Sequence, residues 1–579
     1  MPIEPNRKLA GLMVPVFALR HEDDLGIGDT AAVKQAIEFC TRHGIGVLQV
    51  LPINETGGDN SPYNAISSVA LDPVLLSFSP RSVPGFQPGD LDKAATQAEL
   101  SELRQGPVKY PRVKRLKEDL LQSAYARFSS EHLAGRTPLA CAFDQFKNRH
   151  AGWLPQYTLF RTLVAEHGGN ACWTQWPLEL QTPAGAESWL SSCPDGERLG
   201  RYRDFCAYIQ WVAFSQWQEV RALADDLAVE LMGDIPFGVN RYSADVWGQR
   251  ELFDLDWYGG APAEPSFAGD PFVRQWGQNW GIPLYRWSAH ADQDFAWWRQ
   301  RIERVSDFFH HFRIDHVLGF FRVYAFPWPP ERNQEFVDLT HDQAAAKTGG
   351  HLPLFLPAAD DTPEHSEMNA SQGVALLKVI RQAAATTGIV AEDLGVVPPY
   401  VRPILQALDI PGFYIPMFER VGKDRSYKPK EKIPPLSLAT YGTHDHPPLA
   451  AFYEELVNWW HGPDGHEGWL EVKRLMRFLG MDPEHPPETC TAALHHELLR
   501  AILESRAWLA VFMVTDLLLT SQRFNQPGLH GESCWSERLD RPLPAYQDDP
   551  QFGPRLRLFS DLIRQTGRVP ARQGQSLPV

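Results

Sequence analysis

Residues 308–317 read FFHHFRIDHV, a segment of strand length whose apolar beginning leads into charged and imidazole side chains. Residues 388–395, GIVAEDLG, and residues 438–445, LATYGTHD, repeat this pattern, with apolar residues first and polar residues last. Short apolar runs bounded by Gly, Pro or charged residues are typical of strands that are buried on both faces of a parallel sheet. We therefore predict three buried strands whose carboxyl ends carry reactive side chains.

Segments of the same kind complete a set of eight predicted strands. The segments between them have the pattern of helices, for example TAAVKQAIEFCTRHG at 30–44 and GVALLKVIRQAAATTG at 373–388. Strands that alternate with helices predict a parallel sheet, and eight such units predict a (β/α)8 TIM barrel. The active site of that fold lies at the carboxyl ends of the strands, where RIDH, AEDLG and GTHD occur. The five further strands are predicted at residues 9–19, 46–53, 230–239, 412–419 and 509–518.

The intervals between the predicted strands are uneven, which indicates insertions. A βα unit needs only about 30 residues, yet residues 54–229 separate the second strand from the third. We predict a single catalytic barrel over residues 1–579 with large, mainly helical insertions at its C-terminal face. They are an insertion subdomain at 54–229, a substrate-loop insertion at 240–287 after the third strand, and a helical insertion at 446–508 after the seventh. These insertions are expected to wall a groove above the barrel.

The composition excludes several classes of partner. The chain has 55 basic and 71 acidic residues and a net charge of −16, which repels nucleic acid and anionic lipid. Its seven cysteines are widely spaced without a CxxC pair, so neither a disulfide framework nor a zinc site is indicated. There is no signal-peptide pattern, and no apolar run reaches about 18 residues. We predict a cytoplasmic protein without nucleic-acid or membrane partners; the sequence does not indicate its oligomeric state.

The polar strand ends place Asp315, Glu392 and Asp445 at one barrel mouth. Retaining glycoside transfer needs a carboxylate nucleophile and a carboxylic acid about 5 Å apart, on opposite sides of the anomeric carbon. The fourth and fifth predicted strands are neighbours and supply such a pair in Asp315 and Glu392. Arg313 shares a strand face with Asp315, so its charge is expected to keep that carboxylate ionised. Glu392 is expected to stay protonated, as an acid must.

Motifs along nearly the whole chain resemble those of the amylomaltases, the family 77 glycoside hydrolases of the alpha-amylase clan. This resemblance implies a 4-alpha-glucanotransferase that moves α-1,4-glucan segments from a donor to the 4-hydroxyl of an acceptor sugar. Its substrates would be maltooligosaccharides and glucose, with no cofactor and no metal. The motifs are, in chain order, LGIGD (25–29), QVLPI (49–53), Ser61-Pro62-Tyr63, GDIPFGV (233–239), SADVW (243–247), GQNWGIPLY (277–285), RIDH, AEDLG, GTHD and DLLLTSQRFNQPG (516–528).

The resemblance also implies roles for individual residues. Asp315 would be the nucleophile that forms a covalent glycosyl-enzyme, and Glu392 the general acid and then base. Asp445 would hold the 2- and 3-hydroxyls and stabilise the transition state. The implied substrate-binding residues are Tyr63, Asp234, Asp245, Trp280, Arg313, His316 and His444, with Tyr63 as the stacking platform.

The chain departs from the family pattern where acceptor sugars bind. Residues 262–267 read PAEPSF instead of the family's Pro-Pro-Asp-Tyr-Phe loop, and His446 stands where the family commonly has Asn. Because no catalytic carboxylate is lost, we expect activity with an altered length or acceptor preference.

Three alternative interpretations use the same residues. An alpha-amylase-like hydrolase has the same three acids and differs only in that water intercepts the glycosyl-enzyme. A non-catalytic glucan-binding protein would keep the fold but has no need for all three acids and Arg313. A metal site built from His310, His311 and His316, or from residues 444–446, suits imidazole and carboxylate ligands, but Pro447-Pro448 indicates a sharply turned loop there.

Overall fold

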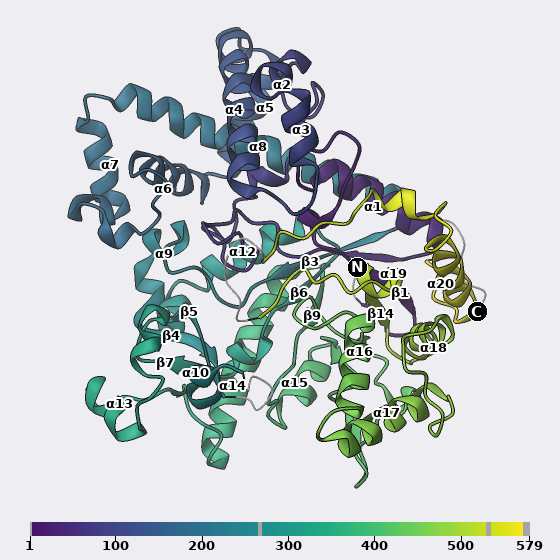
Figure 1. Cartoon of the computed structure of the whole chain (residues 1–579). Coiled ribbons are helices and arrows are strands. Elements are labelled where there is room, and N and C mark those ends of the chain that lie inside the picture. The colour runs from purple at the N-terminus through teal and green to yellow at the C-terminus, as the bar shows by residue number, and fades with distance from the viewer. Residues whose placement is uncertain (1–2, 264–268, 528–533, 571–579) are drawn as a thin grey trace.

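The computed structural model describes residues 3–263, 269–527 and 534–570 (Figure 1). Its centre is a closed barrel of parallel strands in the order β1-β14-β13-β10-β9-β6-β3-β2. Each strand overlaps one of the eight predicted segments, so the predicted TIM barrel is confirmed. The strands are β1 (Leu9–Met13), β2 (Val47–Gln49), β3 (Glu230–Ile235), β6 (His311–Ile314), β9 (Gly388–Ala391), β10 (Gly412–Tyr414), β13 (Ser437–Ala439) and β14 (Leu509–Met513).

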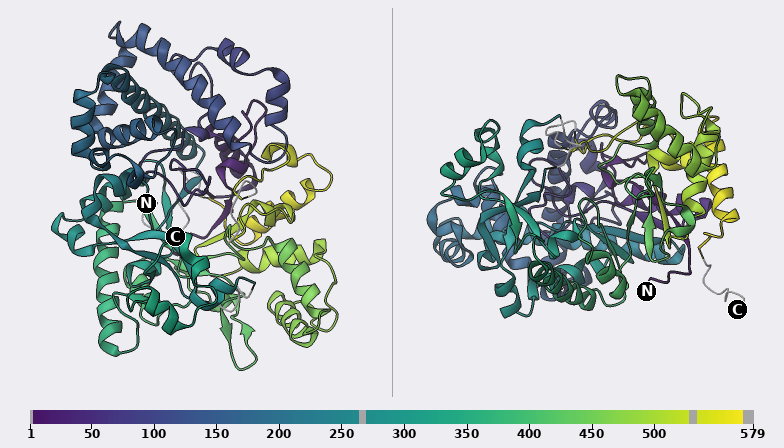
Figure 2. Two further views of the ribbon diagram at one scale, coloured as in Figure 1. Left: turned by 60° about the vertical axis from the view of Figure 1, so that its left-hand side comes forward. Right: turned by 90° about the horizontal axis from the view of Figure 1, so that it is seen from below.

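The barrel strands are apolar because they are covered on both sides. β1 is buried along its whole length and pairs with β14 and with β2. Helices that follow or precede the strands form the outer ring, as parallel sheets require (Figures 1 and 2). They include α1 (Thr30–His43), α8 (Gly196–Asp226), α12 (Ala296–Ser306), α14 (Pro363–Ala384), α15 (Val401–Ala407), α18 (Ala492–Leu503) and α20 (Gly553–Gln565).

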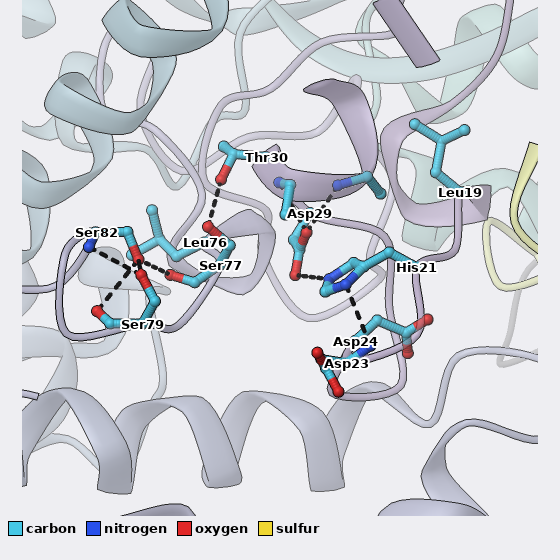
Figure 3. A network of polar contacts seen from close by, with 12 residues as sticks. Leu19, His21, Asp23, Asp24, Asp29, Thr30, Leu76, Ser77, Ser79 and Ser82 are labelled. Atoms are coloured by element: carbon cyan, nitrogen blue, oxygen red, sulfur yellow. Dashed lines mark hydrogen bonds and ion pairs between the residues drawn. The ribbon is translucent and has the colours of Figure 1, made fainter. Parts of the chain in front are cut away.

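Helix α1 shows how local sequence sets the ends of an element. The carboxylate of Asp29 caps its first turn by accepting the N–H groups of Ala31 and Ala32. The other oxygen of Asp29 lies 3.0 Å from Nε2 of His21 (Figure 3). At the other end Gly44, with φ of 72°, adopts the left-handed conformation that terminates helices. The LGIGD motif thus ends on the cap of α1.

The segments between barrel strands are mainly helical. The helices within residues 54–229 and those within 446–508 lie on different sides of the barrel (Figure 2). None of the helices in the described part of the chain is both long and apolar enough to cross a membrane. The boundaries of the insertions stay predictions. The helices are α2 (Pro88–Ala94), α3 (Gln97–Leu103), α4 (Tyr110–Arg127), α5 (Pro138–Arg149), α6 (Leu154–Glu166) and α7 (Pro183–Ser192) with α8 in the first range, and α16 (Leu449–Trp460) and α17 (Gly465–Leu479) with α18 in the other.

One antiparallel sheet beside the barrel was not predicted. Its strands pair in the order β5-β4-β7-β8. It joins the hairpin of the 240–287 insertion to the segment that follows β6, so the substrate-loop insertion has a regular scaffold. The strands are β4 (Phe253–Ala261), β5 (Gln278–Tyr285), β7 (Val323–Phe326) and β8 (Leu354–Leu356).

A buried charge cluster ties strands β3 and β6 together where they begin. Glu230 is the first residue of β3, and its Oε2 lies 2.7 Å from Nε2 of His311 in β6. Its other oxygen lies 2.7 Å from Nη1 of Arg7. Burial alone would raise the pKa of Glu230, but the hydrogen bond and charge of His311 and the cation of Arg7 lower it to about 2. The carboxylate is therefore ionised throughout the neutral range.

We expect Glu230→Gln to lower the free energy of unfolding by about 2 kcal/mol near neutral pH, because two charge-assisted hydrogen bonds are weakened. A carboxyl group whose pKa is lowered in the folded state stabilises the folded protein at pH values above its ordinary pKa of 4.5. This contribution is lost as the pH falls toward 2. In urea unfolding, the difference in free energy of unfolding between the wild type and Glu230→Gln should therefore shrink below pH 4. The matched control is Glu219→Gln, which breaks an exposed pair with Lys34 and should cost less than about 0.5 kcal/mol. A difference that is constant from pH 7 to pH 3 would contradict the prediction.

Candidate active site

Arg313 joins three carboxyl groups at the carboxyl ends of β3, β6 and β9. The arginine is 1% exposed, and its Nη1 contacts the two oxygens of Asp234 at 2.8 and 2.7 Å. Its Nη2 lies 2.7 Å from Oδ1 of Asp315 and 2.7 Å from Oε1 of Glu392. Two oxygens that share one nitrogen are no farther apart than twice that distance, so the two acids lie close enough to act on one anomeric carbon, as the acid pair of a retaining enzyme does. The structure thus brings the predicted pair together.

Tyr63 and His444 form one side of this cluster. The hydroxyl of Tyr63 donates to Oδ2 of Asp234 at 2.7 Å, and its ring stacks on His444 with centroids 4.9 Å apart. The ring of Trp535 flanks both, at 5.8 Å from Tyr63 and 5.7 Å from His444. Tyr63, Asp234, Arg313 and His444 therefore converge as predicted, while Trp535 was missed because no sequence pattern marked it.

Asp445 lies at the opening of the site, with its side chain 39% exposed. Its Oδ1 accepts a hydrogen bond of 2.6 Å from Nδ2 of Asn525, and its Oδ2 lies 3.3 Å from Nε2 of His444. Arg523 donates to its backbone carbonyl at 3.0 Å. The sequence motif at 516–528 contains Arg523 and Asn525, but sequence reasoning assigned neither a role. Asp445 is thus oriented while keeping an accessible face.

His316 holds Glu392 from the backbone. Its N–H donates to Oε2 of Glu392 at 2.9 Å, and its φ of 45° is unusual for a residue other than glycine. Trp280, 38% exposed, packs edge-on against the His316 ring at 4.8 Å. Within the described part of the chain, no group of three or more His, Cys, Asp or Glu side chains is arranged to hold a metal ion.

The pKa values of Asp315 and Glu392 in the free site are shifted in the opposite directions to those expected from the sequence. Burial, with the charges of Glu392 and two neighbouring carboxylates, raises the pKa of Asp315 well above its ordinary value despite Arg313. Burial would raise the pKa of Glu392 as well, but Arg313 and the His316 N–H lower it to about 2. The directions of these two pKa shifts are opposite to the expectation of an ionised Asp315 and a protonated Glu392. The sequence could not show that both acids share Arg313.

The structure places Asp245 apart from these contacts. It lies in α9 (Ala244–Gly248), where its carboxylate accepts the backbone N–H of Ser68 at 2.8 Å and Nε1 of Trp297 at 3.0 Å. The side chain is buried. These bonds fasten the segment after Tyr63 to α9 and α12. A direct contact of Asp245 with sugar stays a prediction.

The two departures from the family pattern differ in what the structure describes. His446 turns back on its own loop, with Nδ1 at 3.1 Å from the Thr443 N–H and 3.0 Å from its Oγ1. Its ring lies 5.5 Å from Phe418, which is exposed. Of the altered segment 262–267, residues 264–267 lie outside the described residues.

Solved structures share this fold. The amylomaltase from Streptococcus agalactiae in complex with acarbose superposes with a TM-score of 0.72 at 20% identity, covering 97% of this chain and 100% of that one. The amylomaltase from Corynebacterium glutamicum gives a TM-score of 0.74 at 18% identity, covering 96% of this chain and 75% of that one. The barrel with its insertions is thus an architecture that amylomaltases have.

Sequence comparison gives the family. A protein from Chlamydia caviae named 4-alpha-glucanotransferase is 30% identical over 551 residues, covering 91% of this chain and 90% of the relative. One of the same name from Thermus thermophilus is 28% identical over 529 residues, covering 91% of this chain and 93% of the relative. The family model of glycoside hydrolase family 77, described as 4-alpha-glucanotransferase, matches residues 14–543. The chain belongs to this 4-alpha-glucanotransferase family.

Proposed function

We propose that this 4-alpha-glucanotransferase works by a retaining double displacement on Asp315, Glu392 and Asp445. The observation that carries the proposal is the shared contact of Asp315 and Glu392 with Nη2 of Arg313 at 2.7 Å. This contact keeps the two acids close together, as the nucleophile and the acid of a retaining enzyme must be. The substrates are α-1,4-glucans, maltooligosaccharides and glucose. We also propose a cytoplasmic location, which rests on the unpaired spacing of the cysteines in the sequence.

In the first step a carboxylate oxygen of Asp315 attacks the anomeric carbon and the glycosidic oxygen leaves with a proton from Glu392. In the free site the pKa of Asp315 is raised and that of Glu392 is lowered, so this step needs a proton to pass from Asp315 to Glu392. A sugar that enters between the acids displaces Glu392 from Arg313. Arg313 then pairs with Asp315 alone, which favours the Asp315 anion, while Glu392, desolvated and without that cation, takes the proton.

In the second step the 4-hydroxyl of an acceptor sugar attacks the glycosyl-enzyme. Glu392, now a carboxylate, takes the hydroxyl proton as the new glycosidic bond forms and Asp315 leaves. Asp445 accepts hydrogen bonds from the 2- and 3-hydroxyls of the donor sugar, because Asn525 and His444 orient it while part of it remains exposed. Tyr63 supports the donor sugar from the side of His444. After the second step Asp315 is an anion and Glu392 is protonated, as both were just before the first step.

Incubation with maltotriose tests the proposal. Transfer should yield glucose together with maltooligosaccharides longer than maltotriose, separated by anion-exchange chromatography. Because each transfer breaks one glycosidic bond and makes another, the number of reducing ends should stay constant. The alternative, an alpha-amylase-like hydrolase, would give glucose and maltose without lengthening and a steady rise in reducing ends. That result would reject the transferase.

A further inference from the structure

Asp516 is a buried carboxyl group that the proposed mechanism does not use. It lies in α19 (Val514–Leu518), directly after β14, and is 1% exposed. Its Oδ1 accepts the backbone N–H of Leu449 at 2.8 Å. Leu449 is the first residue of α16, and the residue before it, Pro448, provides no side-chain cap. Asp516 therefore caps a helix that belongs to a different part of the barrel rim.

Leu449, the residue that Asp516 caps, lies four residues after Asp445 in the chain. The segment after β14 also makes hydrogen bonds to Asp445 itself. Arg523 donates to the Asp445 carbonyl and Asn525 to its Oδ1. The loop from Asp445 to Leu449 is therefore fixed at both ends by one stretch of chain. Pro447 and Pro448 lie between the two anchors, and their fixed φ angles make the link stiff. A shift of Leu449 would therefore move this loop and, with it, Asp445.

The surroundings of Asp516 contain little that would stabilise a negative charge. Its hydrogen-bond donors are the backbone N–H groups of Leu449 and Met513, and burial raises the pKa of Asp516 to about 7. The titratable and charged groups around it are Tyr441, Cys490, His495 and Arg555. Burial keeps the first three neutral near pH 7, because it raises the pKa of Tyr441 well above 10 and that of Cys490 to about 11, and lowers that of His495 to about 4.

We propose that Asp516 is a positioning residue for glucan transfer: by holding the first residue of α16, it sets where Asp445 lies relative to Asp315 and Glu392. The inference rests on the role proposed above for Asp445. An apolar residue of similar size would fill the same space but could not hold Leu449. The geometry therefore assigns Asp516 a role beyond packing.

The test compares Asp516→Leu, which removes the acceptor, with Asp516→Asn, which keeps one. For maltotriose transfer, Asp516→Leu should lower kcat at least about tenfold and change KM less than about threefold, because a small misplacement of a catalytic group costs rate more than binding. Asp516→Asn should keep at least about a third of kcat. Because only the wild type gains a charge-assisted cap as Asp516 ionises, the ratio of wild-type to Asp516→Asn kcat should rise between pH 6 and pH 8.

Tyr453→Phe is the matched control. Tyr453 is buried on α16, and its hydroxyl donates to the carbonyl of Pro487, away from the Asp445 loop. Losing this bond should leave kcat within about twofold of the wild type. Asn525→Ala removes the hydrogen bond from Asn525 to Asp445. The variant that combines it with Asp516→Leu should lose less kcat than the product of the two single losses.

A kcat of Asp516→Leu within about twofold of the wild type, or losses that multiply with Asn525→Ala, would overturn the inference. If Asp516→Leu does not fold, the combination of Asp516→Asn with Asn525→Ala decides: a loss of kcat smaller than the product of the two single losses supports the inference, and losses that multiply reject it. Asp445→Ala separates the two proposals. If Asp445→Ala is inactive and Asp516→Leu is unaffected, only the present inference fails; if Asp445→Ala remains active, the proposed role of Asp445 fails.

Discussion

Asp315→Asn should abolish glucan transfer, lowering kcat by at least about 10⁴-fold. The amide has the size of the carboxylate and still accepts a hydrogen bond from Arg313, but it carries no anion to attack the anomeric carbon and cannot form the glycosyl ester. Donor binding should survive, because Tyr63, Trp280 and Asp445 are unchanged. Initial rates with maltotriose measure the loss, and calorimetric titration with maltotetraose should give a Kd within about threefold of that of other inactive variants.

The matched control is Asp225→Asn, the same isosteric change at a position outside the site. Asp225 is half exposed, and its Oδ1 lies 2.7 Å from Nε2 of His310, the residue before β6. The activity of Asp225→Asn should remain within about twofold of that of the wild type. Because deamidation of the introduced amide would restore the carboxylate of Asp315, intact mass must confirm the variant. Turnover above about 1% in a sample of correct mass would mean that the nucleophile is another group.

The barrel could be predicted from sequence because its strands are covered on both faces. β1 and β14 are apolar at every position, so each reads as an unbroken run. The sheet β5-β4-β7-β8 escaped prediction because β4, FDLDWYGGA, mixes charges, glycines and aromatics and is only partly buried. The sheet also joins the β4–β5 hairpin to β7 and β8 from a segment beyond β6, and no local pattern shows that they pair.

The candidate site was predictable where a strand end fixes the position of a side chain. Asp315 and Glu392 follow β6 and β9, which are adjacent in the barrel, so their meeting follows from strand order. Asn525 and Trp535 follow α19 and belong to no helix or strand, so no periodicity in the sequence predicts where they lie. The pKa values of the two acids depend on the guanidinium nitrogen of Arg313 that both contact. Composition and sequence spacing do not show that the two acids share this nitrogen.

Glu392→Gln should lower transfer from maltotriose by about 10²–10⁴-fold, the usual contribution of general acid–base catalysis. The glutamine cannot protonate the leaving glycosidic oxygen in the first step or deprotonate the acceptor hydroxyl in the second. With α-maltosyl fluoride as donor, the first step needs no acid because fluoride leaves as an anion. The first step should therefore recover while the second stays slow, and the glycosyl-enzyme should accumulate.

This accumulation can be measured as a burst of fluoride equal to the enzyme concentration, together with an intact mass increased by one maltosyl group. Peptide mapping should place the group on Asp315. Azide, a small nucleophile that needs no general base, should then restore turnover and give maltosyl azide. The variant with both Asp315→Asn and Glu392→Gln should show neither burst nor added mass. A Glu392→Gln variant as slow with the fluoride as with maltotriose would instead mean that Glu392 supports Arg313 and His316 without transferring a proton, since only proton transfer makes the loss depend on the leaving group.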